Sequence, residues 1–148
     1  MSNPNDTLLN AVLELNKSET MPLQTVEKIL GLELKVDAEK SNDSFAFFTG
    51  RPTGSLVAIK SADYRVPKNR TKVSGEFLSI SLSTQSTLDR AFLIGKLGQP
   101  DDISVPTPSA SALYSAVYKY RLEGRLVKFA IGPGPDEKIV SVILDRTE

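Results

Sequence analysis

The sequence contains neither cysteine nor histidine. Without cysteine there are no disulfides, no cysteine nucleophiles and no thiolate metal sites, so the fold must depend on its hydrophobic core. Without histidine the chain lacks the commonest metal ligand, the usual general base near neutral pH, and every Ser-His-Asp or Cys-His arrangement. Only carboxylates, lysines and tyrosines remain for acid-base chemistry. We therefore predict a protein that is not an enzyme and that uses no cofactor.

Long apolar runs are also missing. No segment approaches the roughly 18 consecutive apolar residues of a membrane-spanning helix. Residues 1–20 have neither a basic start nor a continuous apolar stretch, which argues against a signal peptide. The sequence thus leads us to expect a cytoplasmic protein that does not associate with membranes.

The chain carries no net charge, because 18 Lys and Arg residues balance 18 Asp and Glu residues. This balance gives no overall attraction to nucleic acid or to an anionic membrane. The distribution is uneven, however, and most of the basic excess in residues 41–86 lies in "RVPKNRTK", residues 65–72. We interpret this run as a solvated hairpin tip, or alternatively as a surface for an acidic partner with Arg65, Lys68 and Arg70 as contacts.

A chain of 148 residues has the length of one domain. Helical spacing of apolar residues predicts an N-terminal helix over 6–17, followed by two degenerate repeats at about 20–83 and 84–146. Each repeat is predicted to be a helix followed by a three-stranded antiparallel meander. The strands are predicted at 44–50, 55–64 and 75–83, and at 112–123, 125–131 and 138–145. The helix of the second repeat is expected to begin at Thr84 or Ser86.

The two repeats share short features. "VEKILGLELKVD" and "FLIGKLGQPDD" both end a helix with Leu-Gly, and each is followed by a strand that closes in Gly-Arg. One such unit has too little core to be stable alone, whereas two can share one core. The predicted fold class is therefore α+β, with both units in one sheet, the helices packed on one face and the other face free or partly free.

This repeat resembles the β-lactamase-inhibitor-protein-like fold. The likeness lies in "LDRAFLIGKLGQPDD", "YKYRLEGRLVKF" and "KIVSVILD", with a fainter echo in "VEKILGLELK", "FAFFTGR" and "EFLSISLS". The resemblance implies tandem helix-plus-meander units in a saddle-shaped sheet whose concave face binds another protein. Cytoplasmic bacterial immunity proteins often look like small α+β domains of this kind. Unlike the secreted inhibitors, this chain has no cysteine for disulfides.

Tyrosines are concentrated in one predicted strand, where Tyr114, Tyr118 and Tyr120 share a face. Either they lie under the helices with their hydroxyls at the rim, or they line the open face as aromatic anchors for a partner. Phe77 and Ser79 are second candidates, because the strand face that carries them is too polar for a core.

The remaining motifs do not indicate a nucleic-acid, catalytic or phosphate site. Stacking of single-stranded nucleic acid on the tyrosines is disfavoured, because the neighbouring basic residues of that strand point to its other face. The pairs Asp101-Asp102 and Asp136-Glu137 are adjacent in turns and seldom converge on one bond. The loop "GPGPDEK", Gly132 to Lys138, has prolines that remove alternate backbone donors and no helix after it, so we predict a stiff connection between strands rather than a phosphate cradle.

These observations predict a non-catalytic protein-binding module that neutralises a partner, in particular an immunity protein that covers the active site of a bacterial toxin. The alternative is a structural adaptor or assembly factor that bridges other proteins. We expect another protein as the partner, with no nucleic acid, membrane, metal or cofactor. The predicted contact residues are Tyr114, Tyr118, Tyr120, Phe77, Ser79, Arg65, Lys68 and Arg70.

Overall fold

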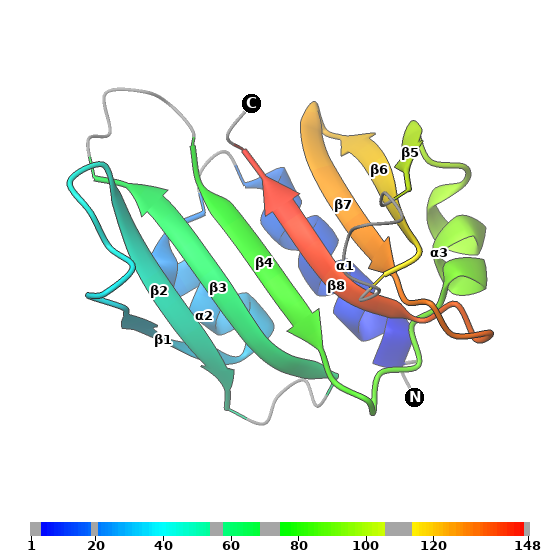
Figure 1. The fold of residues 1–148 in the computed structure, drawn as a ribbon, viewed down its shortest axis with the longest axis horizontal. Coiled ribbons are helices and arrows are strands. Elements are labelled where there is room, and N and C mark those ends of the chain that lie inside the picture. Colours follow the sequence, from blue (N-terminus) through cyan, green and yellow to red (C-terminus); the bar gives the residue numbers. More distant parts are fainter. Residues whose placement is uncertain (1–3, 19–20, 54–57, 69–74, 106–113, 147–148) are drawn as a thin grey trace.

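The computed structural model describes residues 4–18, 21–53, 58–68, 75–105 and 114–146. Within these residues the fold is α+β, with one antiparallel sheet and helices against it (Figure 1). The helices are α1 (Pro4–Lys17), α2 (Leu23–Leu30) and α3 (Arg90–Leu97). The strands are β1 (Leu32–Val36), β2 (Phe45–Pro52), β3 (Ile59–Pro67), β4 (Phe77–Leu82), β5 (Asp102–Ser104), β6 (Ala116–Leu122), β7 (Arg125–Ile131) and β8 (Ile139–Asp145).

The sheet has the strand order β1-β2-β3-β4-β8-β7-β6-β5, with every neighbouring pair antiparallel. Each half of the sheet is a meander that follows a helix, and the last strands of the two meanders, β4 and β8, pair in the middle (Figure 1). The predicted fold class, one antiparallel sheet with helices on one face, is confirmed.

Each meander has four strands rather than the three predicted. The additional strands are β1 and β5. Gly31 ends α2 in the left-handed conformation, with φ of 65°. The chain enters β1 directly, where Leu32 and Leu34 are buried and Glu33 and Lys35 are exposed. Burial of the alternate leucines accounts for this strand.

One hydrophobic core joins the helices to one face of the sheet. It contains Leu15 of α1, Val26 of α2 and Leu93 of α3 together with Ile80 and Val142 of the two central strands, all completely buried. Figure 1 shows α1 and α2 behind the sheet and α3 beside β5 and β6. We call the opposite side of the sheet, which faces the viewer in Figure 1, the open face. No helix in the described residues has the length and apolar character needed to cross a membrane.

The start of α3 differs from the prediction. Neither Thr84 nor Ser86 caps this helix; it begins at Arg90, after the N-cap residue Asp89. The Asp89 side chain accepts a 2.8 Å hydrogen bond from the backbone N–H of Phe92, which satisfies one of the free N–H groups of the first turn. This later start places Arg90 next to the β7–β8 connection, where its backbone N–H donates to Glu137 at 3.0 Å.

Candidate functional site

Two of the predicted contact tyrosines belong to the core. Tyr118 and Tyr120 point to the helix-covered face of β6 and are 8% and 2% exposed. The Tyr118 hydroxyl accepts a 2.6 Å hydrogen bond from Nε of Arg90, and the Tyr120 hydroxyl donates one of 2.9 Å to the carbonyl of Gly98. Burial raises the pKa of Tyr120, because it disfavours the charged phenolate. The prediction that these two residues are exposed anchors is therefore wrong, and the alternative of tyrosines under the helices holds for them.

The other predicted contact residues lie in several places. Tyr114 precedes β6 and is half-buried, whereas Ser79 lies half-buried on the open face of β4. Lys68 is exposed just after β3, and Arg70 lies outside the described residues. Arg65 does not belong to a hairpin tip, because it lies within β3 and pairs with strands on both sides.

The strand register brings Arg65 between phenylalanines of both neighbouring strands. Phe47 of β2 and Phe77 of β4 are its direct cross-strand partners, so the three side chains share the open face. Phe45 precedes Phe47 by two residues and therefore lies on the same face of β2. We call Phe45, Phe47, Arg65 and Phe77 the Phe–Arg cluster.

Within this cluster the guanidinium of Arg65 contacts three aromatic rings. Its Cζ atom lies 4.9 Å from the ring centroid of Phe45, 5.1 Å from that of Phe77 and 5.9 Å from that of Phe47. Each distance allows a cation–π interaction, which is worth about 0.5–1 kcal/mol at an exposed site and more where water is excluded. The rings therefore hold the guanidinium in place on the surface of the sheet.

The same guanidinium keeps unused hydrogen-bonding capacity. Its Nε atom is buried and has no hydrogen-bond partner among the described residues. None of the ion pairs between described residues involves Arg65. A buried donor without a partner costs about 1–3 kcal/mol, so such groups are rare and often belong to functional sites. The cluster thus positions a positive charge that no carboxylate among the described residues pairs with.

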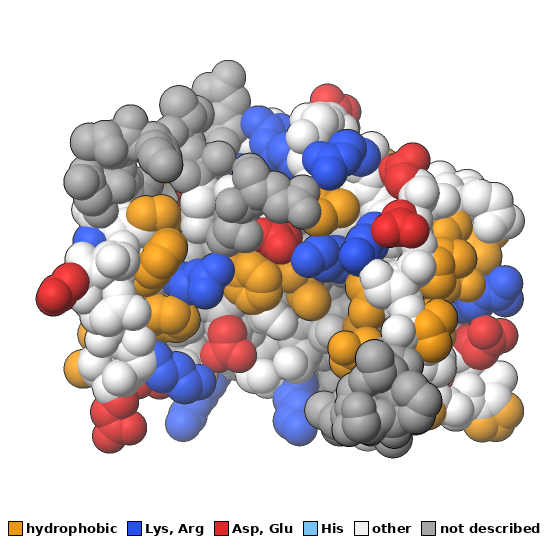
Figure 2. Space-filling model, turned by 45° about the horizontal axis from the view of Figure 1, so that its top comes forward, with side chains coloured by type: hydrophobic (Ala, Val, Ile, Leu, Met, Phe, Trp, Pro, Cys, Tyr) orange, Lys and Arg blue, Asp and Glu red, His pale blue; other side chains and the backbone are white. Residues whose placement is uncertain are grey.

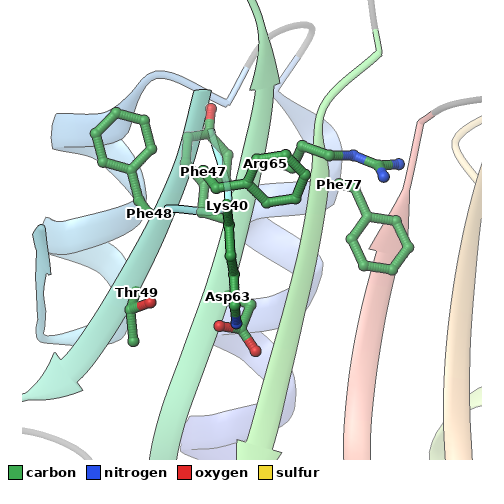
Figure 3. Close-up of a pocket in the computed structure, with 8 residues that line it drawn as sticks. Lys40, Phe47, Phe48, Thr49, Asp63, Arg65 and Phe77 are labelled. Atoms are coloured by element: carbon green, nitrogen blue, oxygen red, sulfur yellow. The ribbon is translucent and has the colours of Figure 1, made fainter. Parts of the chain in front are cut away.

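A shallow pocket of about 220 Å³ adjoins the cluster. Its lining includes Phe47, Arg65 and Phe77 together with the exposed residues Lys40 and Asp63. Figure 3 shows Arg65 extending across the sheet from β3 with its guanidinium near the Phe77 ring. The pocket therefore has apolar walls, two basic groups and one carboxylate.

On the open face of β7, two apolar side chains are buried. Leu126 and Ala130 of β7 point to this face but are 8% and 4% exposed, and neither belongs to the main core. Nearby, Lys128 forms a 3.0 Å ion pair with the largely buried Asp145. In Figure 2, hydrophobic side chains and Lys or Arg side chains lie next to one another on this side of the molecule. The pocket residues over β2, β3 and β4 form a mixed apolar and basic surface on this face.

Asp101, Asp102 and Glu137 of the two acidic pairs make local contacts. Asp101 accepts a 2.6 Å hydrogen bond from the backbone N–H of Arg121, and Asp102 accepts one of 2.9 Å from Ile103. Glu137 lies 3.6 Å from Arg90 in an exposed ion pair. No group of three or more acidic residues that could hold a metal ion occurs in the part of the chain that the structure describes.

The loop from Gly132 to Lys138 connects β7 and β8, as predicted. The backbone N–H of Gly132 donates a 2.7 Å hydrogen bond to the carbonyl of Lys138, which closes the connection on itself. Because that donor is used within the loop, it is not available to a phosphate.

Comparison of the chain with known protein families, curated proteins and solved structures found no match. The resemblance to the β-lactamase-inhibitor-protein-like fold therefore stays a prediction.

Proposed function

We propose that the chain is a non-catalytic protein-binding module that contacts its partner through the Phe–Arg cluster. The observation that carries this proposal is Arg65, held by three phenylalanine rings on the open face with no ion-pair partner among the described residues. Aromatic and arginine side chains dominate the binding energy of protein interfaces, because they bury large areas and make directional polar contacts.

The surroundings of the cluster suit an interface. Ser79 and Ser81 of β4 are small, half-buried residues on the same face, which leaves room for side chains of a partner. A stable interface buries on the order of 800 Å² on each side, so contacts must extend beyond the pocket to the neighbouring sheet surface and loops. Within this proposal the chain neutralises its partner by covering it, and the role we favour is that of an immunity protein against a toxin.

Co-expression with the product of the adjacent gene tests the role. We expect that product to be toxic alone and harmless together with the wild-type chain. Phe47→Ala and Phe77→Ala should each weaken the complex by about 2 kcal/mol, or roughly thirtyfold in Kd, and reduce the protection. A neighbour that is harmless alone, or full protection by both variants, would contradict the proposal.

Phe92→Ala provides a matched control. Phe92 also lies beside a cation, with Nζ of Lys96 5.6 Å from its ring centroid, but it belongs to α3 on the other side of the sheet. We expect this variant to protect like the wild type. Circular dichroism of all three variants verifies that each remains folded.

One observation favours the alternative of an adaptor. Ile103 and Val105, in and just after the edge strand β5, are 47% and 72% exposed. They lie at the opposite end of the sheet from β1 and provide a second apolar surface (Figure 1). An adaptor would bind two proteins at once, so Ile103→Ser should release one of them while Phe77→Ala releases the other.

A further inference from the structure

We propose that the Phe–Arg cluster binds a carboxylate of the partner, the side chain of a glutamate or aspartate. This inference rests on the proposed function and names the chemistry that the same surface recognises. The Cζ atom of the Arg65 guanidinium lies 4.9–5.9 Å from the centroids of three rings, which are not hydrogen-bond acceptors of ordinary strength. The rings fix its position, and its buried Nε atom has no hydrogen-bond acceptor among the described residues.

The charges that line the pocket match a single negative charge. Arg65 and Lys40 contribute two positive charges and Asp63 contributes one negative charge, which leaves a net charge of +1. One carboxylate balances this charge, whereas a phosphate group, with a charge near −2 at neutral pH, would exceed it and be repelled by Asp63. Charge complementarity therefore favours a carboxylate over a phosphate.

The backbone around Arg65 provides no further donors for an anion. Strand β3 pairs with β2 on one side and with β4 on the other, so its N–H groups are used within the sheet. Phosphate sites commonly combine several backbone N–H groups. A planar guanidinium alone is suited to the two oxygens of a carboxylate.

The rings determine what must accompany the carboxylate. Phe47 and Phe77 flank the guanidinium on neighbouring strands, so a ligand reaching Arg65 also contacts apolar surface. An acidic side chain with apolar neighbours in the partner satisfies both requirements. Excluding water from the contact would strengthen the charge-assisted hydrogen bonds.

The test uses three tripeptides that differ at one position. They are acetyl-Leu-Glu-Leu-amide, its glutamine analogue and its phosphoserine analogue, each titrated into the isotopically labelled full chain. Nuclear magnetic resonance follows the ring signals of Phe47 and Phe77 and the Nε–H signal of Arg65. We expect the glutamate peptide to shift these signals with half-saturation in the millimolar range, and both other peptides to bind about tenfold or more weakly.

Two variants assign the interaction to Arg65. Arg65→Gln should weaken binding of the glutamate peptide by about tenfold to a hundredfold, because it removes the charged donor. Lys60→Gln removes an exposed basic group at the start of β3, outside the lining of the pocket, and should leave binding unchanged. Equal binding of the glutamine peptide, tighter binding of the phosphoserine peptide, or no shift with any peptide would each overturn the inference.

The peptide titration and the co-expression test can give opposite results, so failure of the carboxylate site can be distinguished from failure of the proposed function. If the peptides do not bind but Phe47→Ala and Phe77→Ala lose protection, the surface contacts a partner without recognising a carboxylate. If the glutamate peptide binds as expected but Phe47→Ala and Phe77→Ala still protect fully, the carboxylate site is supported and the proposed neutralising interface is contradicted.

Discussion

Arg90 donates a 2.6 Å hydrogen bond from its Nε atom to the hydroxyl of Tyr118, and this bond ties the first turn of α3 to β6. At the other end of the helix, the Tyr120 hydroxyl donates to the carbonyl of Gly98, the C-cap residue. The two tyrosines, on one strand, thus hold both ends of one helix. Their function is to position α3 over the second half of the sheet.

Replacing Tyr120 should therefore affect stability first. Tyr120→Phe removes one hydrogen bond and should lower the free energy of unfolding by about 1 kcal/mol. Tyr120→Ala also leaves a cavity next to Phe129, whose ring centroid lies 5.7 Å away, and should cost about 3–5 kcal/mol. Urea denaturation measures both values. An Ala variant as stable as the wild type would indicate that the Tyr120 side chain is exposed and not part of the core.

The raised pKa of Tyr120 also predicts a loss of stability in alkali. An unfolded tyrosine loses its proton near pH 10, whereas burial keeps the folded hydroxyl protonated to higher pH. Above about pH 10 the unfolded chain therefore binds fewer protons than the folded chain, and the free energy of unfolding falls as the pH rises. This contribution is fully present below that pH.

Denaturation curves between about pH 8 and about pH 11 measure this effect. Tyr120→Phe has no proton to lose at this position, so its free energy of unfolding should decline less steeply over this range than that of the wild type. Equal slopes for the two proteins would contradict a raised pKa of Tyr120 in the folded chain. The comparison uses slopes because the variant is already less stable at neutral pH.

The period of two in "LYSAVYKYRLEG" was enough to place Tyr118 and Tyr120 on one face of a strand, but not to say which face meets the helices. That choice depends on α3, whose ends they contact through Arg90 and Gly98. Strand β5 has only three residues, too few for any periodicity to be recognised. Strand β1 did carry a signal, the alternation of "LELKV" after Gly31.

The candidate site was predicted only in part. Arg65 and Phe77 were singled out from the sequence, for separate reasons, whereas Phe45 and Phe47 were not. In "FAFF" both faces of the strand are apolar, so the sequence does not indicate which phenylalanines face outward. Only the register of β2, β3 and β4 shows that Phe47, Arg65 and Phe77 are neighbours. Such long-range pairing depends on how the strands align and not on local periodicity.

A buried arginine should prove important for α1. Arg146 is 6% exposed, and its Nη2 atom donates to the carbonyls of Leu15 and Asn16 at 3.2 and 3.1 Å. These carbonyls belong to the last turn of α1, where Leu15 also accepts from the backbone N–H of Ser18 and Asn16 from Nη1 of Arg125. Burial lowers the pKa of Arg146, as does the nearby positive charge of Arg125, while the buried Glu76 acts in the opposite direction.

Arg146→Met keeps an apolar stem but removes the charge and both hydrogen bonds. We expect it to lower the free energy of unfolding by about 2–3 kcal/mol, because hydrogen bonds from a charged group are lost and Glu76 stays buried without this charge nearby. Arg51→Met, at an exposed position of β2, is the control and should change stability by less than about 0.5 kcal/mol. Urea denaturation compares the two, and equal effects would refute a special role for Arg146.

The pairing of β4 with β8 predicts how the sheet opens. These strands join the two meanders, and Leu78, Ile80, Val142 and Leu144 fill the core beneath them. Their amides should exchange with solvent only when the whole chain unfolds, and therefore report the global free energy of unfolding. The edge strands β1 and β5 each have one neighbour and should exchange faster. Native-state hydrogen exchange in low denaturant measures this order.

If the amides of β5–β8 exchanged together at a lower free energy than those of β1–β4, the two halves of the sheet would be separate folding units, and the shared core would not couple them.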